Sequence, residues 1–285
     1  MQKIPIRYIQ TASKELGASV GFGIRDLQTV LAGKDMIQDL HRHDFFYMLV
    51  LKKGTGIHEI DFKKYKITNH SLFFMRPGQV HQLRLKGGSV GYLVEFNSDF
   101  YHTLNKRSDQ LLRKASALNF HRFKKNEFDT VYSTLTTVFH EYNGKQERYQ
   151  EAIKANLDIL FIQLIRKCIE CIAENSNPYA QEQMGKFCSL LEKHIISHKQ
   201  ASYYAGLLNL SLYQLNSITR AALGKTSSDI INDYIILESK RYLLSTSNQV
   251  KEIAYHLGYE DVSYFIRFFK KHTGFSPETF RNNSR

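Results

Sequence analysis

The sequence has little cysteine, little proline and no tryptophan: its 285 residues include 3 Cys, 4 Pro and no Trp. An odd and small number of cysteines is not a disulfide framework, and it agrees with a reducing compartment. The sparse proline, together with 42% hydrophobic and 23% charged residues, excludes long disordered or collagen-like segments. No window approaches the ~18 uninterrupted apolar residues of a membrane span, and the first residues lack the apolar core of a secretory signal. We therefore expect a cytoplasmic chain that does not enter a membrane.

Acidic residues are scarce relative to basic ones. The chain has 39 Lys and Arg against 27 Asp and Glu, a formal net charge of +12 and an isoelectric point near 9.4. This excess of positive charge makes a polyanion such as nucleic acid the first partner to consider. The length predicts about two domains, on a prior of ~150 residues per domain.

The N-terminal part has the pattern of a β-protein. Short apolar or alternating segments between residues 37 and 96 are separated by Gly, Asn, Lys and Pro, which is typical of strands and turns. The segments recur about every ten residues, a spacing that suits a β-sandwich or a small barrel.

After about Asp99 the apolar residues take helical spacing. They predict helices over Lys125–Tyr142 and Tyr149–Ile172, separated by a turn at Asn143-Gly144. The second helix has one apolar stripe for a core and, beyond it, further apolar residues at Ile159, Phe161, Ile162 and Ile165. One buried face does not need so much apolar surface, so we expect part of this helix to pack on a second copy of the chain.

The C-terminal part contains a degenerate internal repeat. Tyr204–Leu210 aligns with Ile253–Tyr259, so that Ala205 matches Ala254. Each copy has a small Ala where two helices can cross closely, followed four positions later by a residue that tolerates positive φ, Asn209 or Gly258. A second helix with apolar positions three and four apart follows in each copy. The repeat therefore predicts two helix-turn-helix units.

The second copy continues into Gly258–Arg281, which closely resembles the C-terminal signature of the AraC/XylS-type bacterial transcription regulators. Leu237–Leu244 resembles the connecting helix of that family. The resemblance covers about Met184–Arg281 and implies two helix-turn-helix units joined by one long helix, Ser227–Leu244. Such units would place their second helices in successive major grooves of double-stranded DNA, about 34 Å apart. Sequence-specific transcription regulation is the function that this resemblance implies, with RNA polymerase as a further candidate partner.

The resemblance, with helix geometry, assigns candidate DNA contacts to the exposed faces of the two second helices. Contacts to base edges fall to Tyr213, Asn216, Ser217, Val262, Ser263 and Arg267. Arg267 could bind guanine with two hydrogen bonds, Asn216 could pair with adenine, and Val262 could contact a thymine methyl group. Contacts to phosphates, which position the protein without specifying sequence, fall to Arg220, Lys225, Lys240, Lys270 and Lys271.

Two N-terminal motifs, His41-Arg42-His43 and Pro77-Gly78-Gln79-Val80-His81, resemble the two motifs of a cupin barrel, a fold that regulators of this type often carry. Strand alternation places His41 and His43 on one face, and a hairpin could bring His81 beside them, which would make a ligand set for iron, manganese or zinc. The carboxylate of a metallo-cupin is missing, because Tyr47 and Met48 stand where it is expected. We therefore expect no metal or other cofactor, and keep a metal site at His41, His43 and His81 as the alternative.

Alternation along the predicted strands also suggests a pocket for a polar or anionic small molecule. Its candidate lining is His43, Phe45, Tyr47, His58, His81, Arg84, Tyr92 and Phe96. Cys168-Ile169-Glu170-Cys171 lies within a predicted helix, and no second pair exists to complete a zinc site, so we expect two buried helix cysteines.

These observations predict an α+β protein with three parts. They are a cupin-like, ligand-sensing β-barrel (residues 1–120), a helical segment for linkage and dimerisation (residues 121–176) and an all-α DNA-binding domain with two helix-turn-helix units (residues 181–285). The hypothesis is a homodimeric transcription regulator, not an enzyme, controlled by a small organic effector. The alternative is a metal-dependent cupin enzyme, or a metal-sensing regulator.

Overall fold

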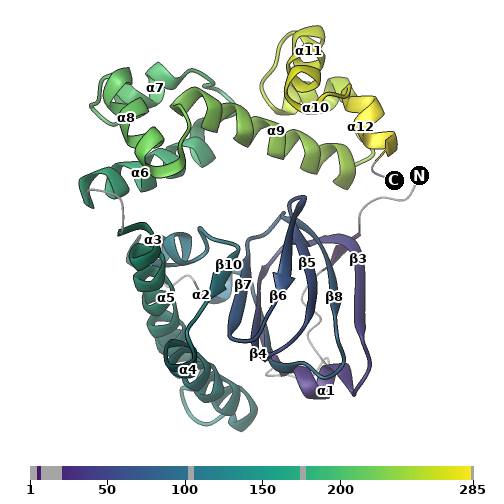
Figure 1. The fold of residues 1–285 in the computed structure, drawn as a ribbon, viewed down its shortest axis with the longest axis vertical. Coiled ribbons are helices and arrows are strands. Elements are labelled where there is room, and N and C mark those ends of the chain that lie inside the picture. The colour runs from purple at the N-terminus through teal and green to yellow at the C-terminus, as the bar shows by residue number, and fades with distance from the viewer. Residues whose placement is uncertain (1–4, 8–20, 102–105, 174–177, 284–285) are drawn as a thin grey trace. The chain divides into compact units, whose positions relative to one another are not determined.

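The structure is a computed structural model that describes residues 5–7, 21–101, 106–173 and 178–283 (Figure 1). The chain forms two compact units. The first unit covers the described residues up to 168, and the second covers those from 169 onward. The boundary between the units lies inside a helix, so the helices before residue 168 belong with the β-structure.

Two five-stranded sheets form the body of the first unit, which confirms the β-structure expected between residues 37 and 96. Sheet one has the order β1 (Ile6–Arg7), β3 (Met36–His43), β8 (Val80–Leu85), β5 (Gly56–Ile60) and β6 (Lys63–Ile67). Sheet two has the order β10 (Phe120–Arg122), β7 (Ser71–Met75), β4 (Phe46–Lys53), β9 (Val90–Phe96) and β2 (Phe22–Asp26). All pairs are antiparallel except that of β1 with β3.

Alternate residues of sheet two bury in two different cores. Leu49, Phe73 and Leu93 pack into a core with Leu83 and Leu85 of sheet one. Their neighbours, such as Met48, Phe74 and Val94, belong to a second core, which they form with the helices that cover the other face of sheet two. Both faces of sheet two are therefore apolar.

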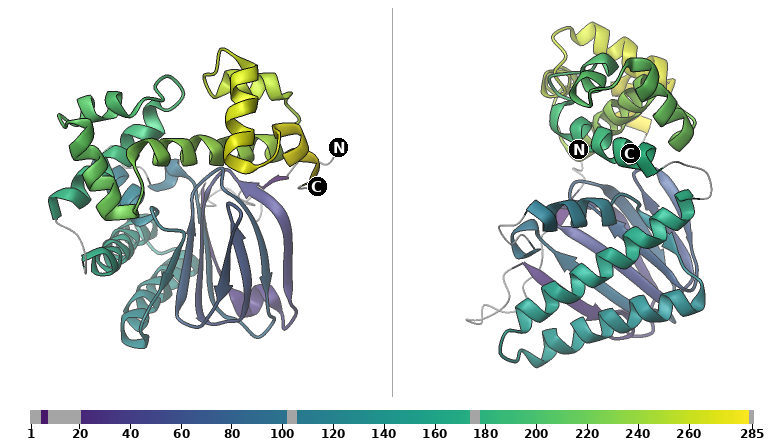
Figure 2. Two further views of the ribbon diagram at one scale, coloured as in Figure 1. Left: turned by 45° about the horizontal axis from the view of Figure 1, so that its top comes forward. Right: turned by 90° about the vertical axis from the view of Figure 1, so that its left-hand side faces the viewer.

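Helices α4 (Lys125–Gly144) and α5 (Tyr149–Ala173) lie side by side over this outer face, as Figure 2 shows. Lys167 of α5 pairs with Glu127 of α4 at 2.8 Å. Three shorter helices complete the unit: α1 (Leu27–Leu31), α2 (Ser98–Tyr101) and α3 (Lys106–Ala115). The two long helices confirm the predicted ones, and the turn between them contains Lys145, with a φ of 46°.

The apolar surface of α5 divides between a buried and an exposed face. Leu157, Phe161 and Leu164 are fully buried in the core with sheet two. Ile159 and Ile162, by contrast, are 49% and 37% exposed. The side chains of Cys168 and Cys171 lie outside the described residues. Within the part of the chain that is described, no helix is long and apolar enough to cross a membrane.

The second unit consists of helices α6 (Pro178–His194), α7 (Ala201–Leu207), α8 (Leu212–Leu223), α9 (Ser227–Ser245), α10 (Val250–His256), α11 (Val262–Thr273) and α12 (Pro277–Asn283). Their apolar faces form one core that includes Tyr204, Leu215, Leu243, Ile253 and Phe265. The predicted connecting helix Ser227–Leu244 is confirmed as α9. Helices α7 and α8 form one helix-turn-helix unit, and α10 and α11 form the other.

The two turns repeat the same backbone geometry. Asn209 and Gly258 both adopt the left-handed region, with φ values of 54° and 72°, as the repeat predicts. In the first turn the Leu210 amide donates to the Ala205 carbonyl at 2.9 Å, and in the second the Tyr259 amide donates to the Ala254 carbonyl at the same distance. The chain thus leaves both first helices in the same direction.

The second turn tolerates no side chain at Gly258. A Cβ atom there would lie 1.9 Å from the Ile196 carbonyl oxygen and also require the left-handed φ. We expect Gly258→Ala to lower the free energy of unfolding by about 2 kcal/mol or more, because backbone atoms must shift. Urea unfolding monitored by circular dichroism measures the change.

The matched control is Asn209→Gly, at the equivalent position of the first turn. We expect it to change the free energy of unfolding by less than about 0.5 kcal/mol, since glycine adopts this conformation freely. Equal losses at the two positions would contradict the steric explanation.

Candidate nucleic-acid interface and histidine cluster

The second helix of each helix-turn-helix unit begins at a polar cap. Ser211 accepts a hydrogen bond from the Gln214 amide at the start of α8, and Gln214 bonds back to the Ser211 amide. Asp261 accepts from the amides of Ser263 and Tyr264 at the start of α11. Such caps satisfy backbone amides that have no partner within the helix. They hold the first turn of each helix, where Tyr213, Val262 and Ser263 lie, three of the six predicted base contacts.

The structure exposes most of the predicted DNA contacts. On α8, Tyr213 is 83% exposed, and Ser217 and Arg220 are exposed too. On α11, Val262 is half-buried, and the exposed positions are Ser263, Arg267, Lys270 and Lys271. The Arg267 guanidinium lies 3.8 Å from the Asp261 carboxylate, and both side chains are more than half exposed. An ion pair of this kind contributes little, so Arg267 can exchange it for another partner.

Asn216 corrects the sequence prediction, because its side chain has a structural partner. Its Oδ1 accepts hydrogen bonds from the Ser227 amide at 2.9 Å and from the Ser227 hydroxyl at 2.8 Å. Ser227 is the first residue of α9, so Asn216 ties α8 to the connecting helix. Pairing with adenine needs this same oxygen, and we withdraw Asn216 as a base contact.

Two predicted phosphate contacts also have partners. Lys240 is half-buried, and its ammonium lies 5.5 Å from the centre of the Phe280 ring, while burial lowers its pKa. This environment differs from the exposed position expected of a phosphate contact, and the assignment of Lys240 to a phosphate remains a prediction. Lys225 remains exposed and pairs with Asp233 at 2.6 Å.

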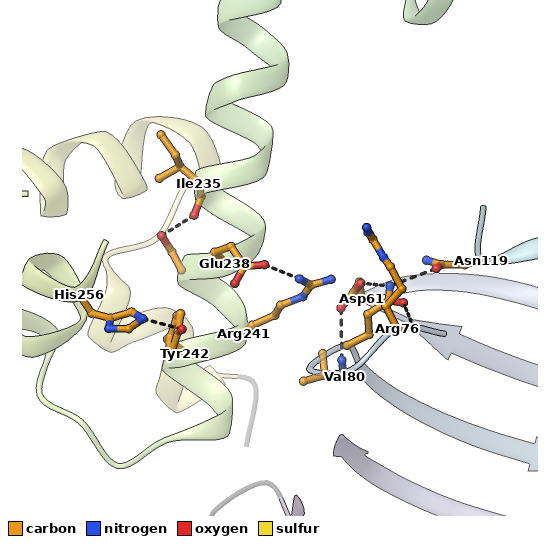
Figure 3. A network of polar contacts seen from close by, with 11 residues as sticks. Asp61, Arg76, Val80, Asn119, Ile235, Glu238, Arg241, Tyr242 and His256 are labelled. Carbon is orange, nitrogen blue, oxygen red and sulfur yellow. Dashed lines mark hydrogen bonds and ion pairs between the residues drawn. The ribbon is translucent and has the colours of Figure 1, made fainter. Parts of the chain in front are cut away.

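Helix α9 is joined to the second helix-turn-helix unit by a hydrogen bond that Figure 3 shows. The Tyr242 hydroxyl and His256 Nε2 share a hydrogen bond of 2.6 Å, which joins α9 to α10, and Arg241 pairs with Glu238 on the same helix. The buried Arg281 of α12 donates to the carbonyls of Leu243 and Asn248. Sequence reasoning missed these residues, because a Tyr, a His and an Arg in helical sequence give no sign of which helix they will meet.

Four histidines of sheet one form a cluster on the inner face of the first unit. His41 of β3 lies directly opposite His81 of β8, and His43 follows two positions later on β3. His58 projects from β5, the strand on the other side of β8. All four side chains are buried. The structure therefore brings together the three histidines of the two sequence motifs and adds His58.

The imidazoles of the cluster contact one another directly. His81 shares hydrogen bonds with His58 (Nδ1 to Nε2, 2.9 Å) and with His43 (Nε2 to Nε2, 2.8 Å). His41 Nδ1 lies 2.7 Å from the Asp39 carbonyl oxygen, so this nitrogen carries the proton and Nε2 carries the lone pair. The Tyr47 ring stacks on His43 at 5.1 Å between centroids.

Burial keeps these histidines neutral. It lowers the pKa of His41 to about 4 and the pKa values of His43 and His58 to about 3, and it lowers that of His81 well below the usual value. The guanidinium of Arg7, on the neighbouring strand β1, lowers the pKa values of His41, His43 and His81 further. Neutral imidazoles offer lone pairs, which a metal ion or a hydrogen-bond donor can use.

The turn before His81 is held by the buried Gln79. Its side-chain nitrogen donates to Asp61 at 2.6 Å and to Asn119 at 3.1 Å, and its oxygen accepts from the Arg76 amide. Asp61 also accepts from the Val80 amide, as Figure 3 shows. These contacts join three loops and fix the start of β8, the strand that carries His81.

Three residues of the predicted pocket lie on the wrong face. Tyr92 and Phe96 belong to the core with the helices, where Tyr92 stacks on Tyr132, and Arg84 is exposed on the outside of sheet one. Each prediction is wrong by one strand residue, which reverses the side-chain direction. Of the other predicted residues, Phe45 and Tyr47 lie in the core between the sheets, and His43, His58 and His81 form the cluster.

The same reversal of side-chain direction along β9 kept Glu95 out of the predicted pocket. It pairs in register with Tyr47, is mostly buried, and bonds to Arg25 of β2 at 2.8 Å. Burial raises its pKa, and Arg25 opposes that change. Alternation in the opposite register would have found Glu95.

Two family models match this chain. An AraC-like ligand binding domain matches residues 34–191, more than half of the chain, and a helix-turn-helix domain matches residues 204–283. The chain belongs to the AraC family of transcription regulators.

Curated relatives and solved structures resemble this chain. The transcriptional activator RhaS of Escherichia coli O157:H7 is 24% identical over 253 residues, covering 85% of this chain and 86% of RhaS. ToxT of Vibrio cholerae O395 is 17% identical, with a TM-score of 0.43, and the match covers 92% of this chain and 97% of ToxT. The C-terminal domain of the response regulator yesN from Fusobacterium nucleatum is 29% identical, with a TM-score of 0.32, over 33% of this chain and 93% of that domain.

The chain is thus a transcription regulator with a ligand-binding domain followed by a DNA-binding domain. The family and the fold confirm the α+β class and the helix-turn-helix pair predicted from the sequence. The homologues are transcription regulators and not enzymes.

The contact of Asn216 with Ser227 is expected to stabilise the second unit. Asn216→Ala leaves the Ser227 amide and hydroxyl without this partner, so we expect the free energy of unfolding to fall by about 1 kcal/mol. The exposed neighbour Ser217→Ala is the control and should change it by less than about 0.5 kcal/mol. Thermal and urea unfolding of the two variants would measure the difference. Equal effects would return Asn216 to the list of candidate base contacts.

Proposed function

We propose that α8 and α11 bind two successive major grooves on one face of DNA, and that the first unit controls this binding in response to a small effector. The observation that carries the proposal is the matched pair of turns at Asn209 and Gly258, with both units packed on the single helix α9. A continuous helix is a stiff connector, so it keeps two recognition helices in a constant relation. Major grooves on one face of B-DNA recur about every 34 Å, and a double recognition unit needs such a spacer.

The exposed side chains divide into two roles under this proposal. Base edges are contacted by Tyr213, Ser217, Val262, Ser263 and Arg267. Phosphates are contacted by Arg220, Lys225, Lys270 and Lys271. Arginine can bind the O6 and N7 of guanine together, while lysine near the end of a helix acts as a point charge on the backbone.

The first unit would act on DNA binding through population shift. An effector must bind more tightly to one arrangement of the two units than to another, since equal affinity for both changes nothing. The described groups that could recognise a polar effector are the histidine cluster, Tyr47 and the Arg25–Glu95 pair. RNA polymerase remains the candidate protein partner of the DNA-bound regulator.

We further propose that the chain forms a homodimer through α5. Ile159 and Ile162 lie three positions apart on a helix whose other face is fully packed, so they form an apolar stripe with Ala155, which is also exposed. A second copy of α5 would cover this stripe, and a dimer would double the number of DNA contacts.

Arg267 and Lys270 are predicted to have different effects on DNA binding. Arg267→Ala should cost about 1 to 3 kcal/mol at the cognate site and relax the preference at one base pair. Lys270→Ala should weaken binding to all sequences equally and reduce its salt dependence. Binding isotherms on cognate and scrambled duplexes at two salt concentrations separate these outcomes. An unchanged specificity ratio in Arg267→Ala would remove this residue from base readout.

The double variant Ile159→Glu and Ile162→Glu tests dimerisation through α5. We expect folded monomers, because both side chains are exposed in the single chain and charges at a dimer seam carry a large desolvation cost. Sedimentation velocity gives the mass, and Ala155→Ser is a mild control on the same face. If the unaltered chain is already monomeric at micromolar concentration, the dimer proposal is wrong.

A further inference from the structure

The interior of the first unit contains polar atoms whose bonding needs are unmet. His41 Nε2, His43 Nδ1, Tyr47 Oη and His58 Nδ1 are buried and have no hydrogen-bond partner among the residues that the structure describes. Buried polar atoms in native proteins are nearly always bonded, because leaving one unpaired costs about 1 to 3 kcal/mol. Three of these atoms belong to the histidine cluster, and the fourth belongs to Tyr47, which stacks on His43. Together they indicate a ligand that bonds to polar atoms at this place.

The geometry of three of these histidines is that of a metal site. His41, His43 and His81 each offer one nitrogen, and these atoms lie within 4.8 Å of one another. All three side chains are buried, and they come from two adjacent strands, which are rigid supports. The hydrogen bond of His41 Nδ1 to the Asp39 carbonyl leaves Nε2 as the coordinating atom. A backbone contact of this kind orients a metal-binding histidine and sets its tautomer.

We propose that His41, His43 and His81 bind one divalent transition-metal ion, with zinc as the best match, and that this ion is an effector of the regulator proposed above. Imidazole nitrogen suits zinc and its neighbours in the first transition row, whereas magnesium and calcium prefer oxygen. Three histidines with a free fourth position are a known ligand set for zinc. This inference rests on the proposed function only for the role of the ion, and not for its binding.

Small movements would complete the site. Ligand nitrogens around tetrahedral zinc lie ~3.4 Å apart, since each Zn–N bond is about 2.0 to 2.1 Å. The Nε2 atoms of His43 and His81, now 2.8 Å apart, would separate slightly as the ion takes the place of the proton between them, and the neutral His43 would then carry that proton on Nδ1. The most distant pair, at up to 4.8 Å, would close.

His58 is a positioning residue in this arrangement. Its Nε2 bonds to His81 Nδ1 at 2.9 Å, so it would accept the proton of that nitrogen while His81 Nε2 binds the metal. Tyr47, stacked on His43, has a buried hydroxyl without a partner in the described part of the chain, and this hydroxyl could bond to the fourth ligand.

The charges near the site determine what the fourth ligand can be. The protein ligands are neutral, so the metal would keep its full double charge, and Arg7 adds a further positive charge near the three histidines. The carboxylate of Glu95, beside Tyr47, is neutralised by Arg25. An anionic or readily ionised fourth ligand is therefore favoured over a neutral one.

The test is metal binding by the full-length protein after treatment with a chelator. Titration calorimetry with zinc chloride should give one ion per chain and a higher melting temperature, and magnesium chloride should give neither. Cobalt(II) should give the strong visible absorption bands of tetrahedral coordination. His43→Gln and His81→Gln should each weaken zinc binding at least about 100-fold, and His58→Phe should weaken it about 10-fold or more.

The control addresses adventitious binding at the surface. The control is the double variant His194→Gln and His198→Gln. The rings of these two histidines lie 6.5 Å apart on the second unit, away from the histidine cluster in sequence. This variant should bind zinc like the unaltered chain. Circular dichroism verifies that every variant is folded, and the cobalt spectrum reports on the site in variants with altered stability.

Two outcomes would overturn the metal site: no zinc binding below about 100 µM, or binding that the surface variant loses and His43→Gln retains. DNA affinity measured with and without zinc tests the role of the ion separately. Zinc binding without any change in DNA affinity would overturn the role as an effector and leave the site intact. A chain that binds zinc but no DNA would instead contradict the proposed function.

Discussion

The first unit depends on the burial of sheet two on both faces. One face packs against sheet one, and the other packs against α4 and α5, so every residue from Tyr47 to Leu51 of β4 is buried. Burying both faces removes much apolar surface from water, which is the main source of stability in a domain of this size. The inner face of sheet one carries the buried histidines beside apolar residues such as Leu83 and Leu85, which pack against sheet two.

The second unit depends on helix α9, which joins the two helix-turn-helix units. Ser227 at its start bonds to Asn216 of α8, and Tyr242 near its end bonds to His256 of α10. Because both recognition units are attached to one continuous helix, their spacing is a property of the backbone, and the exposed residues of α8 and α11 need only supply contacts to DNA.

The first unit contains two buried polar networks that differ in how completely they are hydrogen-bonded. Gln79, Asp61 and Asn119 satisfy one another and fix the start of β8. The histidine cluster, which spans β3, β5 and β8, is only partly satisfied among the described residues, and burial keeps it neutral. A fully bonded network stabilises a fold, whereas a partly bonded one in a sensor domain is where a ligand can contribute most.

The sequence by itself determined the class of fold, the long connecting helix and the two turns at Asn209 and Gly258, because helical periodicity and left-handed turn residues are local properties of the chain. The motifs also brought His41, His43 and His81 to one face through simple strand alternation. Only the tertiary structure decided which face of β9 points inward. Tyr92 and Leu93 are neighbours that are both apolar and both buried, so the sequence pattern does not distinguish the two faces. The structure then placed Glu95 beside Tyr47. It also decided that Asn216 and Lys240 contact other helices, because residues distant in sequence meet only when the helices pack.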